Sequence, residues 1–462
     1  MTKYDLAIIG SGPCGYVAAI RAAQSDMKVC VFEKDKIGGV CLNWGCIPTK
    51  TLSVSSHILY NIQRAGEFGV NIKGYSIDFA KVNARKDMVI KKLAAGIEML
   101  FKVRKIEIIK EKAEIKDAGS ILAGSQEIAA KNILIATGSI PLEIPDMPFD
   151  SSRVLSSTDM LSLDAIPKSI LVVGGGVIGC EFASIYGIFG SDITIVEMME
   201  QLLPGEDEEV AGKIRQGFEK RGFKIFTKTK VESIRKTDNG IKAALSNGLF
   251  IDAEKVLVCV GRRPNSEGFG VRELGICHER GWIRVDKNFR TNIKDIYAAG
   301  DVKGGVLLAH VASKEGISSV ESMLGKESAV DYNVVPNCIF TQPEIASVGL
   351  DEKKARARGF NVCSRKFLFS AIGKAQVLGE TDGFIKLVVN NDNDRIIGAQ
   401  IIGPHATELI AEVLPCIQFG ITSEKLASVI HAHPTLSEIL QEVSEAIHDR
   451  AIHSRPGLER SC

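Results

Sequence analysis

Two cysteines near the N-terminus, Cys41 and Cys46, have a spacing that suits redox chemistry. They lie in the run Gly-Gly-Val-Cys-Leu-Asn-Trp-Gly-Cys-Ile-Pro-Thr-Lys, residues 38–50, with four residues between them. A disulfide that closes so short a loop removes only about 2 kcal/mol of chain entropy from the unfolded state, so it would be a weak structural cross-link. A reversible redox pair fits better, because both thiols stay close together whether they are reduced or oxidised.

A zinc site and two unconnected structural cysteines are the alternatives for this run. Zinc needs further ligands at regular spacing, and no second cysteine or histidine pair is positioned nearby, so we expect no metal site. The total of 11 cysteines is odd, which argues against a disulfide framework. We expect the scattered cysteines to be small core residues or inert thiols. These are Cys14, Cys30, Cys180, Cys259, Cys277, Cys338, Cys363 and Cys416.

A second run with chemical potential lies near the C-terminus, His431-Ala-His433-Pro-Thr-Leu-Ser-Glu438. Pro434 suits the first position of a helix, which would leave the ring of His433 free at the helix entrance. Glu438, in the following turns, could fold back and orient that imidazole. A carboxylate-bound imidazole is a stronger base near neutral pH, and it could deprotonate a thiol. The plainer alternative is that either histidine satisfies a helix end.

The elements that precede the cysteine pair predict a dinucleotide-binding fold. A buried parallel strand, Tyr4–Ile9, leads through Gly10-Ser-Gly12-Pro-Cys-Gly15 into a helix that ends near Gln24, and a second strand, 28–32, ends at Glu33. In such a unit the first glycine allows a tight turn, the second lets the backbone approach a pyrophosphate, and the third permits close helix packing. The helix N-terminus favours phosphate charge, and Glu33 would accept hydrogen bonds from a ribose.

The same unit occurs again in the middle of the chain. Strand 169–173 leads to Gly174-Gly-Gly176-Val-Ile-Gly179, then to a helix, and strand 192–196 ends at Glu197. One glycine pattern is a weak signal, but two complete units predict two dinucleotide sites. No Arg or Lys that could hold a 2′-phosphate stands between Glu197 and Pro204, and Glu197 would repel one, so the second site should prefer NAD over NADP.

Composition and later segments complete the organisation. The 462 residues are 45% apolar and 24% charged, as in ordinary folded proteins. With 57 basic and 56 acidic residues, charge gives no reason to expect a nucleic-acid or membrane partner. We find neither a transmembrane run nor a signal peptide pattern, so we expect a cytoplasmic location. After about residue 334 the pattern changes to antiparallel strands at 384–389 and 395–403 and helices at 405–419 and 423–429.

Together these runs resemble the class I pyridine nucleotide–disulfide oxidoreductases. Residues 38–50 resemble the redox-active disulfide signature of that family, and residues 431–438 resemble its catalytic dyad motif. The resemblance extends in order and spacing over the whole chain. It includes Ala136-Thr-Gly138, Val260-Gly261-Arg262-Arg-Pro-Asn265, Tyr297-Ala-Ala-Gly-Asp301 and Phe340-Thr-Gln-Pro-Glu344. The chain departs from the family at Val40, where Thr is common, and has a tail, 448–462, to which we assign no role.

The resemblance implies an α/β fold with two Rossmann-like domains, for FAD and NAD, and a C-terminal α+β dimerisation domain. The FAD domain with the redox disulfide would span 1–145, the NAD domain 146–266, a central segment completing the FAD domain 267–333, and the interface domain 334–462. The implied FAD positions are Gly10, Gly12, Gly15, Glu33 and Asp301, and the implied NAD positions are Gly174, Gly176, Gly179 and Glu197. Gly138, Gly261 and Lys50 are further cofactor-binding candidates.

The resemblance also implies a mechanism and a homodimer. His433, oriented by Glu438, would take a proton from a substrate dithiol, and the resulting thiolate would attack Cys41. Cys46 would become a thiolate next to the flavin and pass its electrons there, and the reduced flavin would deliver hydride to NAD. Lys50 and Glu181 match positions that form an ion pair beside the flavin. The histidine of one subunit would complete the disulfide site of the other.

Within the family, the chain most resembles the members that oxidise protein-bound dihydrolipoyl groups with NAD. The resemblance lies in Leu-Asn, residues 42–43, and in the run 431–438. The partners would then be lipoyl-bearing carrier or acyltransferase proteins of 2-oxo acid dehydrogenase or glycine-cleavage complexes. One alternative is another NAD(P)H-dependent disulfide reductase, similar to glutathione or mercuric reductases. A distant alternative is a non-catalytic flavin and NAD redox sensor, but it should have lost Cys41, Cys46, His433 or Glu438, and all four are present.

Overall fold

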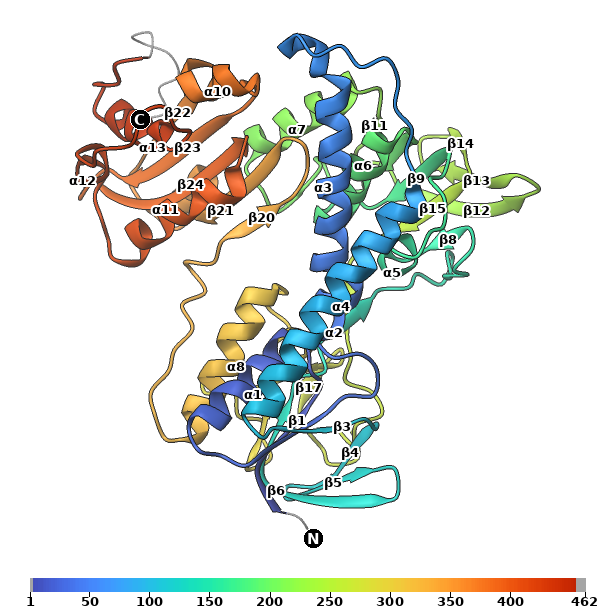
Figure 1. Ribbon diagram of the computed structural model, residues 1–462. Coiled ribbons are helices and arrows are strands. Elements are labelled where there is room, and N and C mark those ends of the chain that lie inside the picture. The colour runs from blue at the N-terminus through green and yellow to red at the C-terminus, as the bar shows by residue number, and fades with distance from the viewer. Residues whose placement is uncertain (1–2, 454–462) are drawn as a thin grey trace.

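The structure, a computed structural model, describes residues 3–453 and contains three lobes (Figure 1). The N-terminal lobe lies at the bottom of the view, a second lobe lies at the upper right, and the C-terminal lobe lies at the upper left. Each lobe is built around its own sheet, and the predicted α/β fold is confirmed. Cys462 and the rest of the tail after residue 453 lie outside the described residues.

The sheet of the N-terminal lobe carries the first glycine turn. It contains β1 (Lys3–Ile9), β2 (Val29–Phe32), β3 (Glu107–Ile109), β4 (Ala113–Asp117), β5 (Ser120–Ala123), β6 (Gln126–Ile135) and β19 (Ile296–Ala298). β1 is central and parallel to β2 and β6, with Ile8 paired to Val31 and Leu134. Helices α1 (Pro13–Gln24) and α8 (Ala309–Met323) pack together beside it, where a Cβ on Gly316 would lie 2.5 Å from the Cys14 carbonyl oxygen.

The second lobe repeats this arrangement. Its parallel sheet has the order β11 (Lys224–Phe226), β10 (Asp192–Val196), β9 (Ser169–Val173), β15 (Lys255–Val258), β8 (Val154–Leu155). The two strands predicted for the second nucleotide unit, β9 and β10, have the predicted bounds. Between them α6 (Val177–Phe189) is buried along most of its length, and α7 (Glu208–Lys220) follows β10. An antiparallel sheet of β12 (Val231–Thr237), β13 (Gly240–Leu245) and β14 (Phe250–Ala253) extends the lobe.

Two long helices connect the lobes and position the cysteine run. α2 (Gly39–Trp44) ends just before α3 (Cys46–Gln63), so Cys41 lies within α2 and Cys46 is the first residue of α3. α3 packs against α4 (Phe79–Val103) and against α6 of the second lobe. Figure 1 shows the two long helices, α3 and α4, running through the middle of the molecule. The N-terminus of α3, which carries Cys46, therefore lies between the two nucleotide units.

The C-terminal lobe is a five-stranded antiparallel sheet covered by helices. The strand order is β20 (Asn337–Ile339), β21 (Glu344–Gly349), β24 (Arg395–Gly403), β23 (Phe384–Asn390), β22 (Val362–Leu368). The predicted hairpin is confirmed, with Asn390 paired to Arg395 at its turn. α11 (Ala406–Gln418) and α13 (Glu438–Ile447) pack on the sheet, and α12 (Ser423–Ala427) contacts α13.

Two sequence-based predictions are wrong in this lobe. Pro434 does not begin a helix, because α13 begins at Glu438, and residues 434–437 form an irregular turn in which the Thr435 amide donates to Glu438 Oε2 at 2.9 Å. Cys363 is not a free thiol, because it is disulfide-bonded. No other cysteine lies close to Cys363 in the sequence, so no local pattern indicates this pairing.

Within residues 3–453, no helix is both long enough and apolar enough to cross a membrane. In the same part of the chain, no group of three or more His, Cys, Asp or Glu side chains is arranged to hold a metal ion.

Candidate active site

A continuous cavity of about 1640 Å³ lies where the three lobes meet. Both glycine turns, the cysteine run and the loops at the carboxyl ends of β6 and β15 line it. The predicted site residues in its wall are Gly10, Gly12, Glu33, Cys41, Cys46, Lys50, Gly138, Gly174, Gly176, Glu181, Glu197, Gly261 and Asp301. The fold therefore brings together most of the predicted site from segments far apart in the sequence.

The glycines of the two turns differ in what surrounds them. A Cβ on Gly15 would lie 1.9 Å from the Gly10 carbonyl oxygen, and a Cβ on Gly179 would lie 2.1 Å from that of Gly174, so both permit close packing of helix on strand and lie behind the cavity wall. Gly176 has no atom within 4 Å of a Cβ, and Gly12 has none nearer than 3.9 Å. Backbone amides at these two positions are therefore open to a phosphate group at a helix N-terminus.

The acid that ends the second strand of each unit is held in the same way. Glu33 accepts hydrogen bonds from the Ser11 amide at 3.0 Å and hydroxyl at 2.6 Å, and from the Asp35 amide at 2.9 Å. Glu197 accepts from the Gly175 amide at 2.6 Å and the Met199 amide at 2.7 Å. Each carboxylate is thus fixed against its own glycine turn, and ionised carboxylates retain capacity for further donors such as ribose hydroxyls.

The cysteine pair is asymmetric in its protonation. Both carry free thiols, and the Cys41 thiol donates a hydrogen bond to Cys46. That bond, helped by the Lys50 ammonium and opposed by burial, lowers the pKa of Cys46 from 9.0 to about 7. The same contact, together with burial, raises the pKa of Cys41. The first proton lost therefore leaves a thiolate on Cys46, at the N-terminus of α3, where the helix dipole also favours negative charge.

Lys50 and Glu181 form the ion pair predicted from the sequence. The Lys50 ammonium donates to Glu181 Oε1 at 2.9 Å and to Oε2 at 2.8 Å. Glu181 is 4% exposed, and its Oε1 also accepts from the Phe340 amide at 2.9 Å. The Lys50 ammonium lies 4.7 Å from the centre of the Phe340 ring. This cluster joins α3, α6 and the segment after β20, so all three lobes meet beside the cysteine pair.

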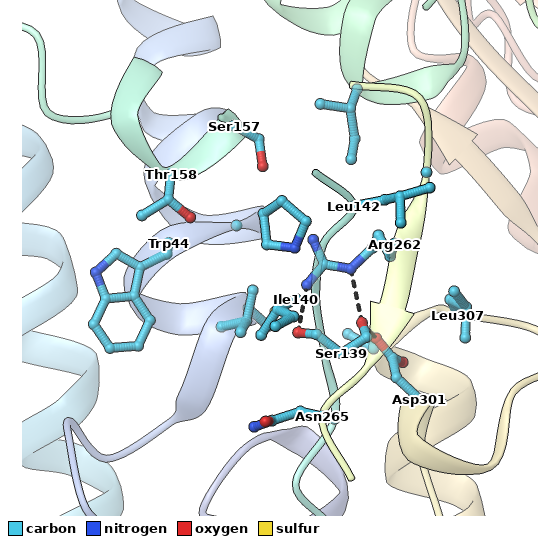
Figure 2. Close-up of a pocket in the computed structure, with 18 of the residues that line it drawn as sticks. Trp44, Ser139, Ile140, Leu142, Ser157, Thr158, Arg262, Asn265, Asp301 and Leu307 are labelled. Atoms are coloured by element: carbon cyan, nitrogen blue, oxygen red, sulfur yellow. Dashed lines mark hydrogen bonds between the residues drawn. The ribbon is translucent and has the colours of Figure 1, made fainter. Parts of the chain in front are cut away.

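Arg262 is a cavity residue to which the sequence assigned no role. Its Nε donates to the Ser139 hydroxyl and its Nη2 to the Ser139 carbonyl, both at 2.7 Å, and that hydroxyl donates to Asp301 Oδ2 at 2.5 Å (Figure 2). Burial lowers the pKa of Arg262, and the charges of Asp301 and Cys46 act against that shift. The run 260–265 carries the family resemblance, but only contacts between distant segments show that the guanidinium points into the cavity.

The imidazole–carboxylate pair is formed but lies outside this cavity. His433 Nδ1 lies 2.8 Å from Glu438 Oε1, and the His433 side chain is 76% exposed. Burial acts to raise the pKa of Glu438, but the hydrogen bonds from His433 and the Thr435 amide lower it overall. The His431 side chain, in contrast, is buried, and its Nε2 lies 2.7 Å from Glu412 Oε1. One copy of the chain therefore presents His433 outward, away from its own cysteines.

Comparisons with known proteins agree with this geometry. Residues 4–316 match the family model described as pyridine nucleotide-disulphide oxidoreductase, and residues 335–444 match the dimerisation domain of the same family. The dihydrolipoyl dehydrogenase of Geobacillus stearothermophilus is 44% identical, with 96% of each chain covered. The dihydrolipoyl dehydrogenase of Bacillus subtilis is 42% identical, with 98% of this chain and 99% of the relative covered.

Solved structures are similar over the whole length. The crystal structure of LpdA from Mycobacterium tuberculosis superposes with a TM-score of 0.90 at 29% identity and covers 97% of this chain and 100% of that one. The HOCl-induced flavoprotein disulfide reductase RclA from Escherichia coli superposes with a TM-score of 0.87 at 29% identity, covering 96% and 99%. With two nucleotide turns, an adjacent cysteine pair and these matches, the chain is an oxidoreductase that belongs to the pyridine nucleotide-disulphide oxidoreductase family.

Proposed function

We propose that the chain is an NAD-dependent dihydrolipoyl dehydrogenase, which oxidises protein-bound dihydrolipoyl groups to lipoyl groups. The observation that carries the proposal is a shared cavity in which a cysteine pair with a low-pKa member, Cys46, lies between two dinucleotide turns. Relatives named dihydrolipoyl dehydrogenase match 96–98% of the chain at 39–44% identity.

The residues of the cavity fit FAD and NAD. Gly10, Gly12, Glu33, Gly138 and Asp301 would hold FAD along the first turn, where the space beside Gly12 is open to a pyrophosphate. The second turn would hold NAD through Gly174, Gly176, Glu197 and Gly261. When bound, FAD supplies the two-electron chemistry that links the cysteine pair to NAD.

The protein's own groups carry out the dithiol half of the reaction. His433 of a second copy, held by its Glu438, removes a proton from one substrate thiol. The substrate thiolate attacks the Cys41 sulfur of the Cys41–Cys46 disulfide, which forms a mixed disulfide and releases the Cys46 thiolate. The second substrate sulfur then attacks the first, closing the cyclic disulfide and releasing Cys41, which keeps the second proton. Two electrons and two protons have left the substrate.

The low pKa of Cys46 makes it the better leaving group in the first exchange. Lys50 stabilises the released thiolate, and Glu181 holds Lys50 in place. Attack on Cys41 is therefore favoured over attack on Cys46, because it expels the more stable thiolate. This order leaves negative charge at the N-terminus of α3.

The preference for NAD over NADP depends on Glu197. Its carboxylate lies in the cavity wall where a ribose is expected, and it would repel a 2′-phosphate. Lys230 also lines the cavity, a basic residue that the sequence pattern around Glu197 did not indicate. The glycine turn fixes Glu197 through the Gly175 amide, so we expect the carboxylate to dominate the choice of cofactor.

The proposal requires two copies of the chain and a lipoyl-bearing partner. A dimerisation domain spans residues 335–444 and includes His433 and Glu438. Because His433 is exposed on one copy, its imidazole would complete the disulfide site of a second copy. The substrates would be lipoyl groups on the carrier or acyltransferase proteins of 2-oxo acid dehydrogenase or glycine-cleavage complexes.

The test is NADH formation by the purified, FAD-containing protein given dihydrolipoamide and NAD, with NADP in parallel. We expect rapid turnover with NAD and little with NADP. If NADH reduces the flavin but the protein reacts with neither dihydrolipoamide nor lipoamide, the redox mechanism would stand and the lipoyl substrate would be refuted. Equal rates with NAD and NADP would refute the role of Glu197.

A further inference from the structure

An acidic segment, residues 205–209, joins the second lobe to the C-terminal lobe. It begins just after Pro204, which lines the cavity, and it leads into α7. Every residue of the segment contacts a side chain from the C-terminal lobe. The distances are 2.9 Å from Lys354 Nζ to the Gly205 carbonyl, 2.6 Å from Asn337 Nδ2 to Glu206, 2.9 Å from Lys386 Nζ to Asp207, 2.6 Å from Lys353 Nζ to Glu208, and 2.9 Å from Lys366 Nζ to Glu209.

The Lys386–Asp207 contact is the buried member of this set. Lys386, on β23, is 7% exposed, and Asp207 is 8% exposed. Lys386 also lies 2.8 Å from Glu209 Oε2, and Asp207 caps α7 by accepting the Glu209 amide at 2.9 Å. Lys353 and Glu208 are largely exposed, and exposed ion pairs contribute little. Loss of one partner of the buried pair would leave an uncompensated charge, so this contact fixes the segment most strongly.

The acidic segment supports the loop that faces the cavity. The Glu206 amide donates to the Leu203 carbonyl at 2.9 Å, and the Leu203 amide donates to the Gly175 carbonyl at 2.8 Å. Leu203 has a left-handed conformation with φ of 49°, which a non-glycine residue adopts only when its surroundings hold it there. Gly175 in turn donates to Glu197. A continuous series of contacts thus runs from Lys386 to the acid that faces the ribose.

We infer that Lys386 and Asp207 are positioning residues for NAD, through which the C-terminal lobe holds the loop of residues 198–204 against the second glycine turn. The inference rests on the proposed NAD site. It adds a role for the lobe that otherwise supplies the dimerisation domain and the His433–Glu438 pair. Cys41 and Cys46 lie on α2 and α3, which do not contain this segment, so the dithiol half-reaction should be independent of it.

The test replaces Lys386 with Met in the full-length, FAD-containing enzyme and measures the two halves of the reaction separately. We expect the apparent KM for NAD to rise at least about fivefold, the size of ordinary coupling between linked sites. The rate at which dihydrolipoamide reduces the flavin, measured without NAD, should stay at the native value. Lys386→Arg should restore the KM, and Lys353→Met, which removes only the exposed pair with Glu208, should leave it unchanged.

If Lys386→Met does not fold, the double variant Lys386→Met, Asp207→Asn avoids the unpaired buried charge and should show the same rise in KM. An unchanged KM in a folded variant would overturn the inference, and so would equal losses in both half-reactions, which would indicate a general structural defect. Flavin reduction by NADH at increasing NADH concentration provides the same readout without a lipoyl substrate. The inference can therefore be judged even if dihydrolipoamide is not the substrate.

Discussion

Lys50 donates to both carboxylate oxygens of Glu181, at 2.9 and 2.8 Å. It lies four residues after Cys46, whose thiolate it stabilises. The two members of the pair act on Cys46 in opposite directions. The Lys50 ammonium lowers the pKa of Cys46, and the Glu181 carboxylate raises it. The hydrogen bond from Cys41 is the main cause of the low pKa of Cys46, and the ion pair adds two opposing contributions while it ties α3 to α6.

Substitutions in this pair should shift the pKa of Cys46 in opposite directions. Lys50→Met should raise that pKa above about 7, and Glu181→Gln should lower it, because glutamine removes the charge but can still accept the Phe340 amide. Ultraviolet thiolate absorbance of the reduced enzyme as a function of pH measures the shift. Burial raises the pKa of Cys14, Cys30, Cys180, Cys259 and Cys338, so these thiols should not contribute near neutrality. Shifts of the same sign in both variants would contradict the assignment.

The reduced enzyme should become more stable relative to the oxidised enzyme as pH rises from 7 to 9. The pKa of Cys46 is lowered from 9.0 to about 7 in the folded protein, so between these values the folded state holds a thiolate and the unfolded state a thiol. The unfolded state then binds more protons, and stability rises with pH. This stabilisation is lost as pH falls through about 7. Denaturant unfolding of both redox forms across this range provides the measurement. Cys46→Ser, which can form neither the thiolate nor the disulfide, should lack the rise in stability that the reduced native enzyme shows.

Local patterns explain why much of the fold could be predicted from the sequence. The bounds of β9 and β10 were predicted correctly because a buried strand, a glycine turn and a helix leave their pattern within about 30 residues. The start of α13 was predicted incorrectly, because a proline can begin either a helix or a turn. Here Glu438 holds a turn by accepting the Thr435 amide. The predicted domain boundaries and the cytoplasmic location remain predictions.

The site was harder to predict where it depends on contacts between distant segments. Arg262 contacts Ser139 from 123 positions away, and nothing in its local run distinguishes it from Arg263. Only the folded chain shows that the half-buried Arg262 lines the cavity while its neighbour Arg263 is exposed. The contact between Lys386 and Asp207 likewise joins two lobes, and no short sequence pattern indicates how these lobes pack against each other.

Arg262→Met should weaken the retention of FAD. The substitution removes both donors to Ser139 and leaves the partly buried Ser139–Asp301 pair without its cation. A lost hydrogen bond of this kind costs about 1–3 kcal/mol, so the dissociation constant of FAD should rise about fivefold to 160-fold. Flavin fluorescence released on dilution measures this change. Arg263→Met is the matched control, since that side chain is exposed and should be replaceable without loss of FAD. Equal flavin release from both variants would argue against a specific role for Arg262.

Glu438→Gln should slow the dithiol half-reaction without slowing flavin reduction by NADH. Glutamine keeps the shape of the side chain but no longer stabilises a protonated His433 at 2.8 Å. General-base catalysis raises a reaction rate by about 10²- to 10⁴-fold, so the dithiol half-reaction should be slowest in His433→Gln. The rate of Glu438→Gln should lie between that of His433→Gln and that of the native enzyme. Stopped-flow flavin absorbance separates the two half-reactions. A Glu438→Gln enzyme with native dithiol kinetics would show that the carboxylate only supports the turn at Thr435.

Two inactive variants should restore activity when their subunits are mixed. Cys41→Ser removes the sulfur that the substrate attacks, and His433→Gln removes the base, so each homodimer should be inactive. If the exposed His433 of one copy serves the cysteines of the other, a mixed dimer has one intact site. Random exchange in a two-fold symmetric dimer makes half the dimers mixed, so activity should return to about a quarter of the native value. Refolding or co-expressing the two variants with different affinity tags allows the mixed dimer to be isolated and assayed. A mixed dimer with no activity would place His433 and Cys41 of the same copy in one site, which the outward position of the imidazole argues against.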